Sequence, residues 1–259
     1  MFLSSSRRIA LVVLAAVPAL SFAELSNDSM IGPGLRSRPA YDGSDSQRTE
    51  FVPVVRHFGN NWFVRSTQGV LEGGARVALA PGLHAGAQLA YEPGRDAGDS
   101  GFLRAHGVPG IKRGASLGLQ AEWDRTFGPV PVTLLARVRK NTTSNLGMQS
   151  DLRLSVGVLK AGPLSAGVFT QATWADSKAM NAMYGVSPAL AASGGLAAHE
   201  AGGGMMFASA GLLGSVDLGP RWLIVASFEE RRLRGDAARS PLAERRANHY
   251  LSAGAAYRF

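Results

Sequence analysis

The sequence predicts an all-β protein, an antiparallel up-and-down transmembrane β-barrel of about 12 strands in the outer membrane. Three observations predict it: an N-terminal export signal, strands whose apolar and polar side chains alternate, and connections that alternate between short and long. A soluble β-sandwich also has alternating strands. The export signal and the sorting of the connections by length therefore decide between the two.

Residues 1–23 have the three zones of a cleaved signal peptide. Two arginines form a positive region, a short apolar stretch follows, and small residues stand third and first before the expected cleavage site. We expect cleavage between Ala23 and Glu24, which leaves residues 24–259 as the outer-membrane β-barrel. The apolar stretch is too short to span a bilayer as a helix.

The composition excludes several kinds of site. The chain has no Cys, so disulfides, thiolate zinc sites and cysteine nucleophiles are absent. The formal net charge is +8, but the basic residues are dispersed, which favours anionic lipid headgroups over nucleic acid as partners. A hydrophobic content of 46% without a mature run of 18 apolar residues fits strands with one lipid-facing side.

Alternation is the signal that places the strands. In residues 115–124, for example, Leu117, Leu119 and Trp123 share one face while Gln120 and Glu122 share the other. We expect strands at 30–38, 49–57, 62–68, 74–80, 83–91, 115–127, 130–140, 149–160, 164–175, 204–218, 221–234 and 249–259.

The connections between these strands fall into two sets. The short set is rich in Gly, Pro and Asn and lies at 59–61, 81–82, 128–129, 162–163 and 219–220. The long set lies at 39–48, 69–73, 92–114, 141–148, 176–203 and 235–248. Outer-membrane barrels have short periplasmic turns and longer extracellular loops, so both termini are expected at the periplasmic end.

Aromatic residues give an independent indication. The four tryptophans each fall near a predicted strand end, and at least three of them share the parity of the apolar face. They predict an aromatic girdle at the two membrane boundaries. The alternative is a set of rings that cap a soluble core. The residues are Trp62, Trp123, Trp174 and Trp222.

The last strand is expected to carry the C-terminal insertion signal. Leu251, Tyr257 and Phe259 share one face with two alanines, and a terminal aromatic behind such a row is the pattern that the barrel-assembly machinery is expected to read. The same strand must pair with the first, because an open sheet edge is not tolerated in lipid.

Three stretches together resemble the MipA/OmpV family of outer-membrane proteins, which is named for an MltA-interacting protein. They are residues 34–44 (GLRSRPAYDGS), 184–188 (YGVSP) and 233–242 (LRGDAARSPL). The Ala/Gly-rich segment 189–204 departs from the usual loop of that family. The resemblance implies an outer-membrane barrel, in some members a scaffold that links a murein hydrolase to a murein synthase. Other members are described as osmotically regulated proteins or adhesion factors.

No pattern in the chain predicts catalysis. The hydrolase elbow, the paired histidines of zinc proteases and the phosphate loop are all missing, and no two of the five histidines have metal-ligand spacing. We therefore expect no catalytic, cofactor or metal site. The alternative is a lipid A-modifying enzyme at the outer rim, which would draw on residues of the outer loops: His106, His199, His249, Ser193 and Ser240.

A cluster of arginines lies at the outer end of the penultimate strand and in the last loop. Arginine pairs well with phosphate, so we expect these residues to be a possible lipopolysaccharide contact. The alternative is a solvated face that pairs with nearby acids. The cluster comprises Arg231, Arg232, Arg234, Arg239, Arg245 and Arg246.

The predicted lumen face carries four positive and three negative residues: Arg76, Arg137, Arg139, Arg153, Glu122, Asp124 and Asp151. Such mixed charge either closes the lumen through cross-barrel pairs or lines a water-filled pore. The leading hypothesis is a non-enzymatic scaffold or interaction protein linked to peptidoglycan and envelope maintenance. Its expected partners are outer-membrane lipids, lipopolysaccharide and a murein hydrolase or synthase. The alternatives are a small-solute diffusion channel and the rim enzyme.

Overall fold

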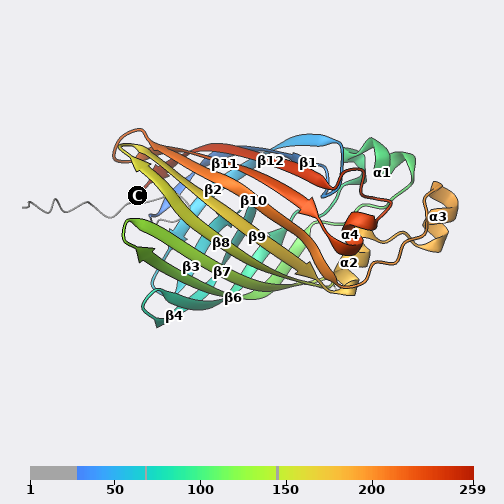
Figure 1. Ribbon diagram of the computed structural model, residues 1–259, viewed down its shortest axis with the longest axis horizontal. Helices are drawn as coiled ribbons and strands as arrows, with labels where there is room; N and C mark the ends of the chain where they lie inside the picture. Colours follow the sequence, from blue (N-terminus) through green and yellow to red (C-terminus); the bar gives the residue numbers. More distant parts are fainter. Residues whose placement is uncertain (1–27, 68, 144–145) are drawn as a thin grey trace, which may run out of the picture.

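The computed structural model describes residues 28–67, 69–143 and 146–259. The predicted signal peptide 1–23 and its cleavage site at Ala23 and Glu24 lie outside the described residues. Figure 1 shows one long barrel with the C-terminus at one end and short helices at the other. The strands are β1 Met30–Pro39, β2 Gln47–Phe58, β3 Trp62–Thr67, β4 Val70–Ala80, β5 Leu83–Glu92, β6 Gly114–Phe127, β7 Val130–Asn141, β8 Met148–Ala161, β9 Leu164–Ala175, β10 Gly204–Asp217, β11 Trp222–Leu233 and β12 Ala247–Arg258.

Every strand is antiparallel to its neighbours, and the sheet closes on itself between β1 and β12. The closing register runs from Met30 opposite Arg258 to Ser37 opposite Leu251. Beyond it, the backbone N–H of Phe259 donates to the carbonyl oxygen of Ser29 at 3.1 Å. Pairing the two terminal strands removes the open edge that lipid would not tolerate. The predicted fold class is confirmed.

The two faces of the wall differ as the alternation predicts. Large apolar side chains point outward and are highly exposed, as with Phe51 at 70% and Leu119 at 68%. Charged side chains such as Glu72, Arg137 and Asp151 point inward and are buried. An exposed apolar surface of this extent is stable when lipid covers it, because the hydrocarbon removes it from water.

The connections are short at the end that carries the C-terminus, and at the opposite end they are long except between β3 and β4. The long connections contain short helices that alternation did not predict. None of the helices in the described residues has the length and apolar character needed to cross a membrane. The helices are η1 Ala97–Asp99, α1 Gly101–Ala105, α2 Ser177–Tyr184, α3 Pro188–Gly194 and α4 Gly235–Arg239.

One predicted connection is wrong. Residues 69–73 were expected to form a long loop, but β4 begins at Val70, so only residues 68–69 separate it from β3. The pair Gly73–Gly74 suggests a loop, yet it lies inside the strand, where a Cβ on Gly74 would collide with the carbonyl oxygen of Ala87. Glycine in a strand often marks such a close approach of two backbones.

Candidate functional site: the lumen and its outer cap

A network of buried ion pairs crosses one half of the lumen. Arg137 of β7 lies at its centre and donates to Asp151 of β8 at 2.6 Å and to Glu72 of β4 at 2.9 Å. Glu72 also accepts from Arg65 of β3 at 2.6 Å, and Arg65 donates in turn to Glu122 of β6. The side chains of Arg137 and Glu72 are 4% and 0% exposed. Four of the seven predicted lumen charges, Arg137, Arg139, Glu122 and Asp151, therefore lie in ion pairs within the lumen.

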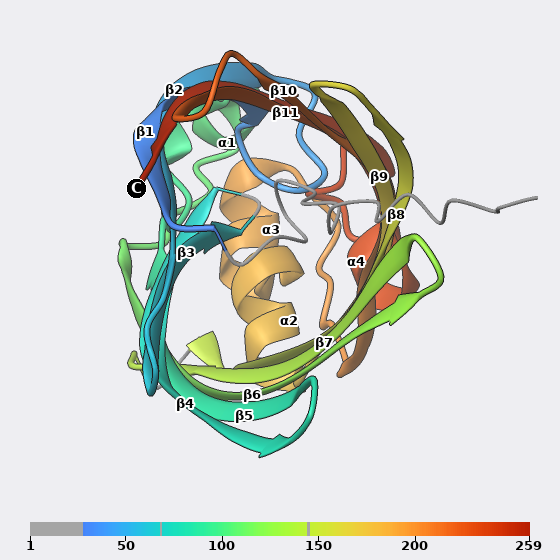
Figure 2. The same ribbon diagram turned by 90° about the vertical axis from the view of Figure 1, so that its left-hand side faces the viewer.

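The hairpin of β3 and β4 leans into the lumen, as the view along the barrel shows (Figure 2). A Cβ on Gly69 would collide with the guanidinium of Arg36, a lumen-facing residue of β1, and the φ of +75° at Gly69 also favours glycine. Arg65 and Glu72 fix the hairpin to the far wall through the ion-pair network. The hairpin thus occupies interior space that a simple barrel leaves free.

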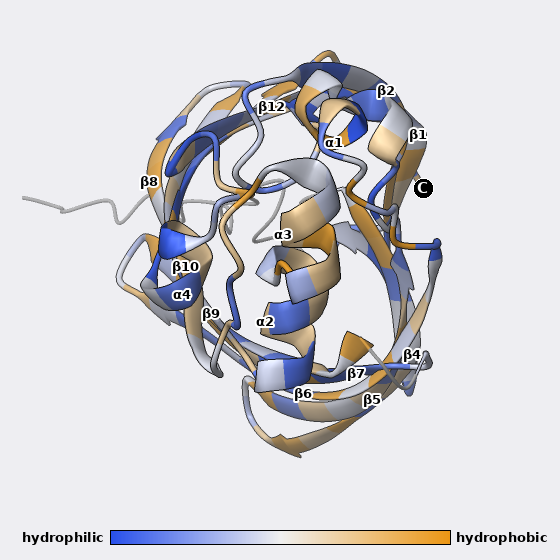
Figure 3. Ribbon diagram, turned by 90° about the vertical axis from the view of Figure 1, so that its right-hand side faces the viewer, coloured by the Kyte–Doolittle hydropathy of each residue, from blue (hydrophilic) through white to orange (hydrophobic). Residues whose placement is uncertain are grey.

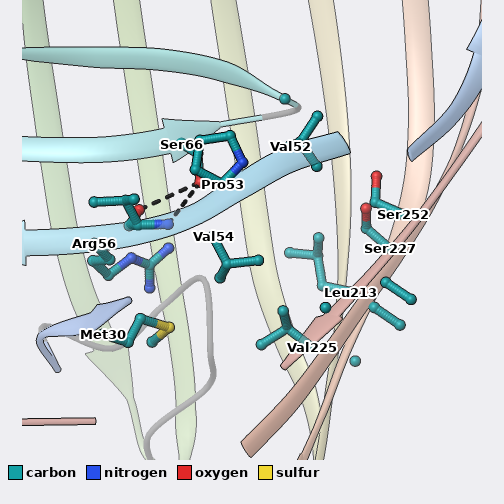
Figure 4. A pocket seen from close by; sticks show the side chains of 16 residues that line it. Met30, Val52, Pro53, Val54, Arg56, Ser66, Leu213, Val225, Ser227 and Ser252 are labelled. Carbon is teal, nitrogen blue, oxygen red and sulfur yellow. Dashed lines mark hydrogen bonds between the residues drawn. The ribbon is translucent and has the colours of Figure 1, made fainter. Parts of the chain in front are cut away.

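Another part of the lumen is lined mainly by apolar side chains. A cavity of about 110 Å³ lies between β2 and the strands β10 to β12. Figure 4 shows Val52, Val54, Leu213 and Val225 around it, with the hydroxyls of Ser227 and Ser252 at one side. Arg56 also lines this cavity, so apolar and charged side chains lie side by side in this part of the interior.

The outer loops form a cap with its own hydrophobic core. One cluster joins Met180 and Tyr184 of α2 to Phe207, Leu233 and Ala237. A second cluster joins Tyr41, Leu103, Val108, Val186 and Leu242, which come from four different connections. Helices α2 and α3 lie across the outer mouth of the barrel (Figure 3). Buried apolar contacts hold these loops in one arrangement.

The three stretches that carried the family resemblance meet in this cap. The hydroxyl of Tyr41 donates to the carbonyl oxygen of Leu242 at 2.8 Å, and that of Ser240 donates to the carbonyl oxygen of Tyr184 at 2.6 Å. Arg231 donates to Asp42 at 2.8 Å. Segments separated by more than 50 residues in sequence are thereby joined into one unit.

A charged and aromatic cluster lies directly below the cap. Arg231 pairs with Asp42 and Glu229, and its guanidinium carbon lies 4.4 Å from the ring centre of Tyr250. The guanidinium carbon of Arg36 lies 4.9 Å from the same ring centre. Cations over aromatic faces are stabilised by the ring quadrupole, and more so when they are desolvated. The cluster therefore fixes the inner rim on which the cap rests.

Tyr184 points toward this cluster from α2. Its side chain is 1% exposed, and its hydroxyl makes no hydrogen bond with the residues that the structure describes. Burial, with a smaller contribution from Asp42, raises the pKa of Tyr184 well above its ordinary value. The group therefore stays protonated and offers a hydrogen-bond donor below the cap.

The predicted arginine cluster divides between two surfaces. Arg231 faces the lumen, and its side chain is only 12% exposed. The other five are exposed at the outer end, and three of them have acidic partners: Arg232 with Glu230, Arg239 with Asp236 and Arg245 with Asp45. Arg234 and Arg246 are exposed as well. Lipopolysaccharide contact by the five outer arginines stays a prediction, whereas Arg231 lies beneath them.

All four predicted girdle tryptophans have the lipid-facing parity. Trp62, Trp123 and Trp222 lie at the short-turn end, and Trp174 lies near the outer end of β9. Trp222 packs edge-on against Tyr257 with ring centres 5.3 Å apart.

The C-terminal residues lie beside this girdle. The exposed ring of Phe259 stacks 6.0 Å from His57, and Leu251 faces outward higher on β12. Whether Leu251, Tyr257 and Phe259 are read during assembly stays a prediction.

The histidines and serines considered for a rim enzyme do not meet. His106 and His199 bond to backbone carbonyl oxygens, and His249 lies 3.4 Å from Glu230 on the lipid-facing side. Ser193 and Ser240 likewise donate to backbone carbonyl oxygens. Over the residues that the structure describes, no group of three or more His, Asp or Glu side chains is arranged to hold a metal ion.

A family model described as MltA-interacting protein MipA matches residues 31–259, nearly the whole chain. The chain belongs to the MipA family. No curated protein matches it. Among solved structures it is similar to an outer membrane channel from Pseudomonas putida F1, with a TM-score of 0.50 and 11% identity over 97% of this chain and 100% of that one.

It is also similar to LpxR from Salmonella typhimurium, with a TM-score of 0.49 and 10% identity over 89% of this chain and 100% of that one. OmpT of Vibrio cholerae matches with a TM-score of 0.38 and 9% identity over 81% of this chain and 64% of that one. At these identities the similarity shows the outer-membrane barrel fold alone. Family and fold together place this MipA-family protein in the outer membrane.

The lumen network contains two residues that sequence reasoning missed. Arg65 and Glu72 were not among the predicted lumen charges, because Glu72 fell in a predicted loop and the strand before it is short. Extending the alternation of β4 back through Arg76 and Gly74 places Glu72 on the lumen face. This two-residue period is the sequence pattern from which Glu72 could have been predicted to face the lumen.

Proposed function

We propose that this MipA-family barrel is a non-enzymatic interaction protein, a scaffold linked to murein and envelope maintenance, and that it conducts no solute. The observation that carries the proposal is the buried ion-pair network from Arg65 to Asp151 beneath a cap with its own core. Side chains fill the interior around the network, and helices cover the outer mouth. A protein built in this way presents fixed surfaces for binding.

The first test is electrical. Pure, folded protein in a planar bilayer is expected to give no conductance steps, because a permeant ion would have to displace buried, mutually paired charges. A general porin, reconstituted in the same way, is the positive control. Persistent steps from the MipA-family barrel would contradict the proposal and support the diffusion channel in its place.

The scaffold function requires a surface on the periplasmic side. The turns there are only a few residues long, so a partner has to contact the barrel rim itself. Phe127 and Leu218 lie beside two of these turns and are 56% and 61% exposed. Exposed apolar residues at a rim are suitable anchors for a protein partner. The family description, which names an interaction with MltA, supports a murein hydrolase as that partner.

A binding measurement with matched variants tests this. Immobilised barrel is expected to retain purified MltA, and the F127S/L218S variant to retain it on the order of tenfold more weakly, because an anchor contact contributes at least about 1.4 kcal/mol. R239Q/R245Q at the outer end is the control and is expected to bind normally. If the wild-type barrel does not retain MltA, or if F127S/L218S and R239Q/R245Q retain it equally, the result would count against a periplasmic scaffold.

A further inference from the structure

The barrel wall is incompletely paired beside β2. This strand pairs with β1 from Gln47 to Arg56, but among the described residues its ladder with β3 extends only from Arg56 to Phe58. One more contact follows, in which the N–H of Val55 donates to the hydroxyl of Ser66 at 3.0 Å. Above it the edge of β2 has no neighbouring strand, because the β3–β4 hairpin leans into the lumen.

The sequence of β2 suits an unpaired edge. The N–H of Val55 points toward β3, and the two-residue period of a strand places the nitrogen of Pro53 at the same edge. Proline has no N–H and occurs in sheets on edges. Residue 53 therefore leaves no donor unsatisfied where the wall is open.

A cleft of about 830 Å³ occupies this opening. Its lining includes the lipid-facing side chains of Phe51, Leu71 and Tyr91 as well as the lumen-facing side chains of Glu50 and Val52. The cleft therefore passes through the wall. It lies in the outer half of the barrel, since residues 93–97 and 110–113 of the long connection line its upper side.

The upper side of the cleft is basic. Five cationic and two anionic side chains line it: Arg38, Arg48, Arg95, Lys112 and Arg113, against Glu50 and Asp96. Arg38 and Arg48 both pair with Glu50. Lys112 and Arg113 are exposed and form no ion pair with any residue that the structure describes. The opening thus combines apolar walls at membrane depth with two available cations at its outer end.

We propose that this cleft binds lipopolysaccharide from the outer leaflet. A headgroup phosphate lies against Lys112 and Arg113, and an acyl chain lies between Phe51, Leu71 and Tyr91. Arginine and lysine both bind phosphate well, and the outer leaflet supplies phosphate on a lipid. The site is separate from the outer arginines near the last loop and does not depend on the scaffold function.

The interior gives the acyl chain further room. The cleft and the apolar lumen cavity share Val52, Pro53 and Gly69 in their linings, so the two are contiguous. Val54 and Leu213 continue the apolar surface inward (Figure 4). A chain that enters between β2 and β4 meets hydrocarbon side chains there, and Arg56 lies in the same lining.

The test is native mass spectrometry of the folded barrel in micelles, titrated with purified rough lipopolysaccharide. Each of the two exposed cations is expected to add a charge-assisted hydrogen bond to the bound phosphate. The K112Q/R113Q variant is therefore expected to bind lipopolysaccharide at least about tenfold more weakly than the wild type. K140Q/K178Q makes the same change of charge at exposed positions outside the cleft and is expected to bind like the wild type. F51S removes an apolar wall and is expected to weaken binding as well.

Competition identifies the ligand. Neither inorganic phosphate nor phosphatidylglycerol at equal concentration is expected to displace lipopolysaccharide. Displacement by phosphate would overturn the proposal in favour of a simple anion site, and displacement by phosphatidylglycerol would overturn the assignment to the outer leaflet. Equal binding by K112Q/R113Q and K140Q/K178Q would overturn the cleft as the site.

Discussion

Replacing Arg137 by leucine is expected to lower the free energy of unfolding by about 3–5 kcal/mol, because it removes a buried cation that two buried carboxylates share and leaves Glu72 with Arg65 alone and Asp151 with only the more distant Arg139. Glu72 and Asp151 both accept from this guanidinium, and their side chains are 0% and 3% exposed. The measurement is the shift of the guanidinium chloride midpoint in micelles, followed by the heat-modifiable mobility of the folded barrel.

The control is K140L, which makes a similar change three residues later on the same strand but at an exposed, lipid-facing position. Its effect is expected to be small. The triple variant R137L/E72Q/D151N is expected to recover part of the loss, since it removes the uncompensated charges along with the cation. A single R137L variant as stable as K140L would show that the network does not hold the hairpin in place.

Replacing Arg231 by methionine is expected to loosen the outer cap. The substitution leaves Asp42 without its ion pair and removes the cation from the face of Tyr250, at a cost of about 3 kcal/mol or more. Residues 40–46 are then held to the inner rim by fewer contacts. Protease added to intact cells is expected to cleave the outer loops faster, while the strands stay protected.

The neighbouring residue supplies the control. Arg232 has the same side chain one position along β11, on the opposite face, where it is 62% exposed and pairs with Glu230. An exposed pair of this kind contributes at most about 1 kcal/mol, so R232M is expected to leave cleavage unchanged. Equal protease sensitivity in R231M and R232M would contradict the conclusion that the buried cluster stabilises the cap.

The strands were predictable because the barrel imposes a local rule. Each residue faces either lipid or lumen, so alternation in a stretch such as Leu117 to Trp123 reflects its surroundings directly. Alternation did not locate the start of β4, where a charged lumen-facing residue stands in place of a residue typical of strands. Glu72 and the glycines after it resemble a loop, and only their pairing with β3 and β5 makes them part of β4.

The cap was less predictable, because its elements are short and their stability is not local. Helix α3 follows Ser187, which caps it, with Pro188 at its first turn, yet the helix lies in an Ala/Gly-rich segment that resembles a flexible loop. Short helices of this size are stable only when something packs against them. The partners of α2 and α3, such as Leu242 and Leu103, come from loops far away in sequence.

The sequence by itself predicted a barrel of about 12 strands, the lipid-facing side of the strands with clear alternation and the end at which most long connections lie, because these depend on a two-residue period and on turn residues. Only the tertiary structure shows which lumen charges pair, that the outer loops form a cap with its own hydrophobic core, and that the wall is open beside β2. Those features arise from side chains of strands that are distant in sequence, so no local pattern records them.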